Sequence, residues 1–99
     1  MMLTVVETPT FQRQSREVWT DEEREAFIDW IAMNPDVGVV IPGADGARKV
    51  RWSIKGRGKR GGARVIYFHL TDEGAVLLAL VYAKAERSDV SRRSIKKAM

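Results

Sequence analysis

Short apolar runs and amphipathic stretches follow one another in the first third of the chain and predict a strand followed by two helices. Leu3 to Val6 is apolar and is ended by Thr8-Pro9, which is typical of a first strand. Thr10 can then cap a helix from Phe11 to about Val18. One strand and one helix are therefore expected before the first tryptophan.

The next stretch has the spacing of a second helix. Thr20 and Glu23 form a capping-box pattern, in which a hydroxyl is followed three residues later by a carboxylate. Three large apolar residues share one helical face: Phe27, Trp30 and Ile31. Asn34-Pro35 ends this pattern, so we expect a helix from Asp21 to about Met33 that forms a hairpin with the first helix.

Strands are predicted beyond a glycine-rich loop from Asp36 to Ala47. Within this loop, Val39 to Ile41 is apolar enough to pack under the edge of the core. From Lys49 to Lys55, polar and apolar residues alternate, which gives a strand one cationic and one apolar face. Val65 to Leu70 is apolar or aromatic except for His69 and predicts the next strand.

The last third predicts one more strand and one more helix. Ala75 to Ala83 is almost entirely apolar, as in a central strand that is buried on both faces. A buried helix has a similar composition, but the length of the run and its position after the turn at 71–74 favour a strand. Ser88 can cap a basic helix from Asp89 to Lys97. The expected order is β-α-α-β-β-β-α, in one domain spanning residues 1–99.

The stretch from Arg48 to Leu70 indicates what the chain binds. It contains no acidic residue and eight of the 17 lysines and arginines: Arg48, Lys49, Arg51, Lys55, Arg57, Lys59, Arg60 and Arg64. A basic run is often only a solvated loop, and the glycine-rich linker GRGKRGG alone fits that interpretation equally well. The cationic face of the preceding strand is not required for packing, however, and favours a phosphate-bearing partner.

Composition narrows the choice of partner and compartment. The chain has 99 residues, a net charge of +4 and no cysteine, which excludes disulfides and thiolate metal sites. No apolar run approaches the roughly 20 residues needed to span a bilayer, and the N-terminus lacks the pattern of a signal peptide. We therefore expect a cytoplasmic protein with no membrane association, whose partner is nucleic acid or an acidic protein.

Three segments, GARKVRW, KGRGKRGGARVIYF and LVYAKAERSDVS, together with the order of elements, resemble the RelE/ParE superfamily of bacterial toxins. The resemblance is closest to the HigB-type branch and covers essentially the whole chain. It implies an α+β domain of the RelE-like fold, with a twisted antiparallel sheet and the two-helix hairpin against one face.

The resemblance also implies a function. Such a toxin of a type II toxin-antitoxin system is an endoribonuclease that cuts messenger RNA in the ribosomal A site and stops translation. The implied partners are messenger RNA, the ribosome with its 16S RNA, and a cognate antitoxin of the helix-turn-helix HigA type. The free toxin is expected to be a monomer.

Metal-independent cleavage uses the substrate's own 2′-hydroxyl, which attacks the adjacent phosphorus. The enzyme must remove the 2′-proton, neutralise the phosphorane oxygens and protonate the leaving oxygen. Because His69 is the only histidine, a two-histidine mechanism is impossible. Lysine can serve as the base and arginine as the clamp. The carboxylates Glu22, Glu23 and Glu25 have no histidine or cysteine companions, so we expect no metal, and no cofactor is expected.

The resemblance assigns these tasks to individual positions. Arg64 corresponds to the family's arginine at the start of the third strand and is the first candidate for the transition-state clamp. Lys49 and Arg51 correspond to paired basic positions that contact phosphates, with Lys49 also a possible base. Lys84 and Arg87 follow the last strand, where relatives place further catalytic groups. Four cations are expected to hold the RNA backbone: Lys55, Arg57, Lys59 and Arg60.

The chain departs from the RelE branch at Ala85 and Ser91, where an arginine and a tyrosine are missing. The donor of the proton to the leaving group therefore stays open among Lys84, Tyr82 and Tyr67. Both tyrosines can also stack RNA bases, although aromatic residues on strands more often belong to the core.

Two other functions fit the same charge pattern. One is a ParE-like inhibitor of DNA gyrase, which cuts nothing. The other is a non-catalytic module that binds nucleic acid through the cationic face. His69 and the three tryptophans are expected to be structural.

Overall fold

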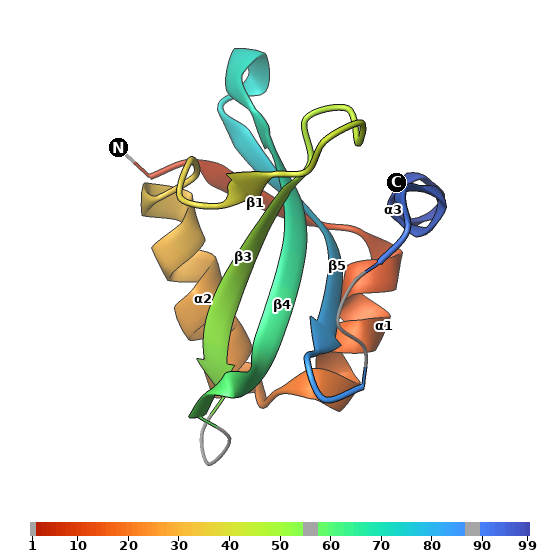
Figure 1. Ribbon diagram of the computed structural model, residues 1–99. Helices are drawn as coiled ribbons and strands as arrows, with labels where there is room; N and C mark the ends of the chain where they lie inside the picture. The colour runs from red at the N-terminus through yellow and green to blue at the C-terminus, as the bar shows by residue number, and fades with distance from the viewer. Residues whose placement is uncertain (1, 55–57, 87–89) are drawn as a thin grey trace.

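The computed structural model describes residues 2–54, 58–86 and 90–99, with backbone only for 58–61. Five strands form one sheet in the order β1-β5-β4-β3-β2 (Figure 1). The strands are β1 (Thr4–Glu7), β2 (Val39–Val40), β3 (Arg48–Ile54), β4 (Gly58–Leu70) and β5 (Ala75–Ala83). The helices are α1 (Pro9–Val18), α2 (Asp21–Met33) and α3 (Arg92–Ala98).

The sheet is mixed, which corrects the expectation of an antiparallel sheet. β3, β4 and β5 are antiparallel neighbours, but β1 pairs with β5 in parallel. The hairpins after β3 fix the direction of β5, and β1 lies at the free edge of that strand in the parallel orientation. Pairing between strands so distant in the sequence is not visible in a local pattern.

Local signals gave most of the helix boundaries. α2 spans the expected residues, and its capping box is present: Thr20 Oγ1 accepts from the Glu23 amide at 3.2 Å, and Glu23 Oε1 accepts from the Thr20 amide at 3.0 Å. α1 begins earlier than predicted, because Thr8 rather than Thr10 is its cap and Pro9 needs no hydrogen-bond acceptor in the first turn.

The last helix begins later than predicted. Ser91, not Ser88, caps α3, and its Oγ accepts from the Ser94 amide at 3.1 Å. The predicted start at Ser88 and Asp89 lies outside the described residues.

The valines at 39 and 40 do not pack under the core, contrary to the prediction. They form β2, an additional strand that pairs with Arg48 and Lys49, and their side chains are 75% and 50% exposed. Backbone pairing at the edge of the sheet holds this segment, so its apolar composition did not indicate burial.

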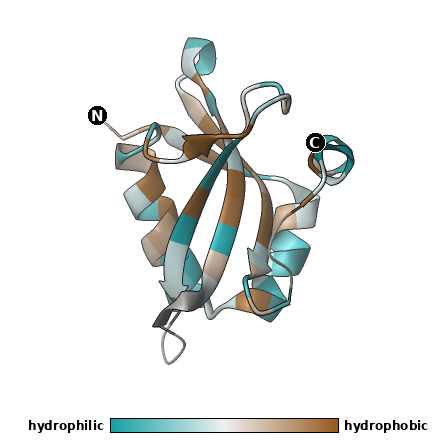
Figure 2. Cartoon of the chain, viewed as in Figure 1, coloured by the Kyte–Doolittle hydropathy of each residue, from teal (hydrophilic) through white to brown (hydrophobic). Residues whose placement is uncertain are grey.

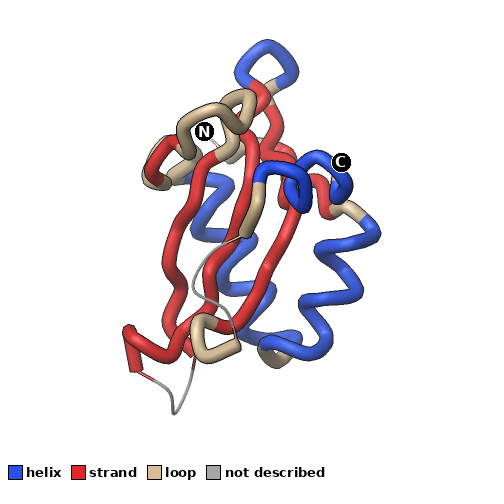
Figure 3. Tube along the Cα trace, turned by 45° about the vertical axis from the view of Figure 1, so that its right-hand side comes forward, coloured by secondary structure: helices blue, strands red, loops and turns tan. Residues whose placement is uncertain are grey.

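The helical hairpin lies on one side of the sheet and α3 on the other (Figure 3). The sheet separates two hydrophobic clusters. α1 and α2 cover one face, where Phe11, Phe27 and Ile31 pack against β4 and β5 together with the three tryptophans. On the other face, α3 contributes Ile95 and Ala98 to a cluster with Phe68 and Leu80. Within the described ranges, no helix has the length and apolar character needed to cross a membrane.

Candidate functional site

Three neighbouring strands bring Arg51, Arg64 and Tyr82 into one row across the sheet. Arg51 of β3 is paired with Arg64 of β4, and Arg64 is paired with Tyr82 of β5. The Cβ atoms of such partners lie roughly 5 Å apart. We call these three residues the arginine row.

The arginine row lies on the face that α1 and α2 leave uncovered. We call the cluster under α1 and α2 the helix-side cluster. Ala63 and Val65 flank Arg64 in the chain and belong to this cluster, so Arg64 points to the other face. Figure 2 shows a hydrophilic band that crosses β3 and β4 between hydrophobic stretches. The alternation predicted for β3 is confirmed: Val50, Trp52 and Ile54 belong to the helix-side cluster, which leaves Lys49 and Arg51 for the uncovered face.

Arg64 is a buried cation beside another cation. Its side chain is 4% exposed, and Nη1 donates to the Ala63 carbonyl at 3.3 Å. Burial lowers the pKa of Arg64, and the charge of Arg51 lowers it further, while Tyr82 acts in the opposite direction. Among the residues that the structure describes, no carboxylate forms an ion pair with Arg64.

This arrangement suits an anion. Two guanidinium groups side by side repel each other, and a phosphate placed between them accepts hydrogen bonds from both and removes the repulsion. Arginine keeps its charge even when its pKa is lowered, so Arg64 remains a fixed positive group.

The other predicted catalytic residues are Lys49, Lys84 and Arg87. Lys49 is half-buried on β3, two residues before Arg51 and therefore on the same face. Lys84 is exposed directly after β5, and its amide donates to the Gly62 carbonyl at 3.1 Å, which extends the pairing with β4. Arg87 lies outside the described residues.

The predicted RNA-backbone contacts are only partly described. Lys55 and Arg57 lie outside the described residues. Lys59 and Arg60 belong to β4, which begins at Gly58, rather than to a free linker, and their side chains are not described.

Tyr67 has no surface on which an RNA base can stack, which corrects its place among the RNA contacts. Its side chain is fully buried in the helix-side cluster. The hydroxyl donates to the Pro35 carbonyl at 2.8 Å and accepts from the Gly38 amide at 2.9 Å. Burial raises the pKa of Tyr67, which suits this structural role. Tyr82 is 2% exposed, so it too lacks a free ring face, although it belongs to the arginine row.

His69 lies near the end of the central strand β4 and contacts Asp36. Nδ1 of His69 is 2.7 Å from Asp36 Oδ1, and Arg48 Nη2 is 3.6 Å from the same oxygen. The hydrogen bond from His69 lowers the pKa of Asp36, and the charges of His69 and Arg48 add to this effect. The contact fits the structural role expected for His69.

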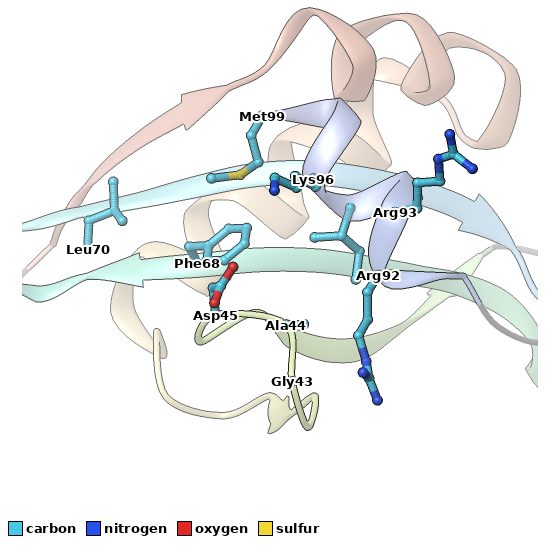
Figure 4. A pocket seen from close by; sticks show the side chains of 10 residues that line it. Gly43, Ala44, Asp45, Phe68, Leu70, Arg92, Arg93, Lys96 and Met99 are labelled. Carbon is cyan, nitrogen blue, oxygen red and sulfur yellow. The ribbon is translucent and has the colours of Figure 1, made fainter.

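A cavity of about 630 Å³ lies on the same sheet face and was not foreseen from the sequence (Figure 4). The loop before β3, the end of β4 and α3 line it, with Phe68 and Ile95 among its apolar residues and Arg92 and Lys96 among its cations. The basic residues of the last helix were visible in the sequence, but their position over the turn at 43–46 depends on tertiary packing. The described residues contain no group of three or more His, Cys, Asp or Glu side chains that can hold a metal ion.

No family model matches the chain. Among solved structures, the chain is similar to the E. coli toxin RelE, in a free-state structure that carries two arginine-to-alanine substitutions. The TM-score is 0.68 and the identity 17%, and the match covers 100% of both chains. The chain therefore has a RelE-like fold, and the fold class expected from the sequence is confirmed.

Proposed function

We propose that this chain is the toxin of a type II toxin-antitoxin system and acts as a ribosome-dependent endoribonuclease on messenger RNA. The observation that carries the proposal is the pair Arg51 and Arg64 on the uncovered face of a RelE-like sheet. A buried arginine that has no acidic partner among the described residues, next to a second arginine, is suited to a charge that appears on the substrate during reaction.

In the proposed mechanism, the 2′-hydroxyl attacks the adjacent phosphorus, and Arg64 and Arg51 bind the phosphorane oxygens. Because Arg64 is held by the surrounding sheet, little reorganisation is needed when the additional negative charge develops. Lys49 contacts the phosphate or takes the 2′-proton. Lys84, Arg87 and Tyr82 are the candidates for assisting the leaving 5′-oxygen.

Four further cations of the stretch from Arg48 to Leu70 are assigned to the RNA backbone: Lys55, Arg57, Lys59 and Arg60. In this proposal the chain belongs to the HigB-type branch and acts in the cytoplasm on the ribosome and its 16S RNA. A helix-turn-helix antitoxin of the HigA type neutralises it. The RelE-like fold and the basic stretch from Arg48 to Leu70 support these assignments.

The test is primer extension on a messenger in a purified translation system, with and without ribosomes. Wild type is expected to produce ribosome-dependent cuts, and Arg64→Ala is expected to lower their rate by about 100-fold or more, as for loss of a transition-state donor. Arg13→Ala is the matched control, because Arg13 is an exposed arginine on α1, on the opposite side of the sheet. It should cut like wild type.

An intact messenger with wild-type protein would contradict the nuclease function. Inhibition of DNA gyrase would then favour a ParE-like toxin, and salt-dependent binding without any cleavage or gyrase inhibition would favour a non-catalytic nucleic-acid-binding module.

A further inference from the structure

The cavity and the arginine row lie on the same face and along the same strand. Arg64, Ile66 and Phe68 alternate onto this face of β4, and Ile66 and Phe68 belong to the cluster that α3 covers. Four residues of a strand span roughly 13 Å. A single-stranded RNA whose phosphate lies at Arg64 therefore reaches the cavity within a few nucleotides.

The lining combines an apolar floor with polar groups at its sides. Phe68 and Leu70 come from β4, and Ile95 and Met99 come from the α3 segment. In Figure 4, Asp45 extends toward Phe68 from the loop and Lys96 extends toward it from α3. The volume of about 630 Å³ lies in the range of small-molecule sites, roughly 300–1,000 Å³.

Two of the cavity's walls contact each other. The Arg92 guanidinium lies against the Gly43 backbone, so closely that a Cβ atom at Gly43 would be 2.9 Å from Arg92 Cζ. Gly43 also has a φ of +70°, which favours glycine. The contact places a cation at the rim and fixes the loop relative to α3.

We propose that this cavity binds a nucleobase of the single-stranded RNA whose backbone contacts the arginine row. The inference rests on the proposed function, since it names the substrate contact beside that site. Phe68 supplies an aromatic contact, Asp45 accepts hydrogen bonds from base N–H groups, and Lys96 donates to ring acceptors. Guanine offers both N–H donors and the O6 and N7 acceptors, so it is the preferred base.

The alternative occupant is an acidic amphipathic protein segment. Its carboxylates would suit Arg92 and Lys96, and its apolar side chains would suit the floor. Asp45 counts against it, because a carboxylate in the lining repels an acidic segment but serves a nucleobase as an acceptor. Continuity with the arginine row also favours RNA.

The test is an NMR titration of the full ¹⁵N-labelled chain with guanosine 5′-monophosphate, uridine 5′-monophosphate and ribose 5-phosphate. Guanosine monophosphate is expected to shift the amides of Asp45, Phe68 and Lys96, with an affinity about fivefold or more above that of uridine monophosphate. Asp45→Asn should remove this preference. Asparagine adopts the φ of 54° found at Asp45 readily, so the variant should fold.

Lys96→Gln and Lys97→Gln form a matched pair on α3. Both lysines are exposed, but only Lys96 lines the cavity. Lys96→Gln should weaken guanosine monophosphate binding, whereas Lys97→Gln should bind like wild type. If both variants bind guanosine monophosphate equally weakly, the proposal is overturned, because the loss of affinity would then follow from the lower net charge alone.

Three further outcomes would also overturn it. One is guanosine monophosphate that leaves the cavity amides unshifted, and another is ribose 5-phosphate that reproduces its shifts alone. A synthetic helical peptide of glutamate and leucine that shifts these amides, while nucleotides do not, would instead identify a protein-docking groove.

Primer extension separates this inference from the nuclease function. Asp45→Asn is expected to redistribute the cut sites, because the base preference is lost. Unchanged cut sites would overturn the base pocket and leave the nuclease standing. If guanosine monophosphate shifts the cavity amides but the wild-type protein never cuts messenger RNA, the nuclease function is contradicted and the base pocket is retained.

Discussion

Arg64 is a cation at a position where a central strand normally carries an apolar side chain. It is 4% exposed, and its strand neighbours Ala63 and Val65 are fully buried. Among the described residues no carboxylate pairs with Arg64, so burying its charge costs free energy, and the adjacent Arg51 adds repulsion. Proteins keep residues that lower the free energy of unfolding in this way mainly where a function depends on those residues.

Arg64→Met should therefore stabilise the protein while removing its activity. Methionine fills a similar space without a charge, so we expect the free energy of unfolding to rise by about 1 kcal/mol. Urea denaturation measures this change, with the exposed Arg13→Met as the control. A less stable Arg64→Met protein would show that Arg64 is retained for packing, and it would weaken the argument for a functional cost.

Asp36 should make stability depend on pH. Its pKa is lowered in the folded state by the hydrogen bond with His69 and by the charges of His69 and Arg48. A lowered carboxyl pKa contributes stability above the unfolded-state pKa of about 4, and this contribution is lost as the pH falls through the folded-state pKa. Wild type should therefore be more stable than Asp36→Asn at neutral pH, and the difference should shrink below about pH 4. Urea denaturation at several pH values tests this, and a pH-independent difference would contradict it.

At the scale of elements, side chains of the sheet hold the segment that leads into β2. Tyr67 binds Pro35 and Gly38, and Arg48 donates to the carbonyls of Asp36 at 3.2 Å and Gly38 at 2.9 Å. Only glycine fits at position 38, because a Cβ atom there would be 2.8 Å from the Tyr67 hydroxyl. Side chains of β3 and β4 therefore hold the segment that leads into β2, the two-residue strand at the edge of the sheet.

Tyr67→Phe should loosen this segment without affecting the arginine row. The substitution keeps the ring but leaves the buried Gly38 amide without its acceptor, at a cost of about 1–3 kcal/mol in the free energy of unfolding. Hydrogen exchange at the Gly38 amide should accelerate, while cleavage stays close to wild type. A strong loss of cleavage in a folded Tyr67→Phe protein would restore a functional role for this tyrosine.

The elements also show what a single sequence can predict. β5 has the predicted bounds, and α2 ends at the residue near which its end was expected, because a capping box and a continuous apolar run are local signals. β2 and the parallel β1–β5 pair were missed, since both depend on partners far along the chain.

The candidate site also has a part that the sequence predicts and a part that only the folded sheet shows. Alternation along β3 predicted the face that carries Arg51, whereas the register that sets Arg51 beside Arg64 is a property of the folded sheet. The cavity under α3 needed the tertiary packing of the turn at 43–46.

At the scale of the molecule, the two sides of the sheet differ in charge. α2 carries Asp21, Glu22, Glu23, Glu25 and Asp29 on the side that the helices cover. The opposite side carries the arginine row and the cations of α3. This separation orients the protein so that the uncovered face meets a polyanion first.

The salt dependence of RNA binding tests this orientation and separates binding from catalysis. The logarithm of the association constant for a single-stranded RNA should fall linearly with the logarithm of the salt concentration. Arg51→Ala should reduce that slope by about one, as expected for one lost phosphate contact, whereas Arg13→Ala on the helix side should leave it unchanged. Fluorescence anisotropy measures both.

Arg64→Ala decides between a nuclease and a binding module in the same experiment. A transition-state clamp makes its strongest interaction after the phosphorane charge has formed, so its loss should lower cleavage by about 100-fold or more. Affinity for the uncut RNA should fall by less than about tenfold, the effect of losing one ordinary phosphate contact. If affinity and cleavage fall in proportion, Arg64 only holds RNA, and the uncovered face is a binding surface whose chemistry lies elsewhere.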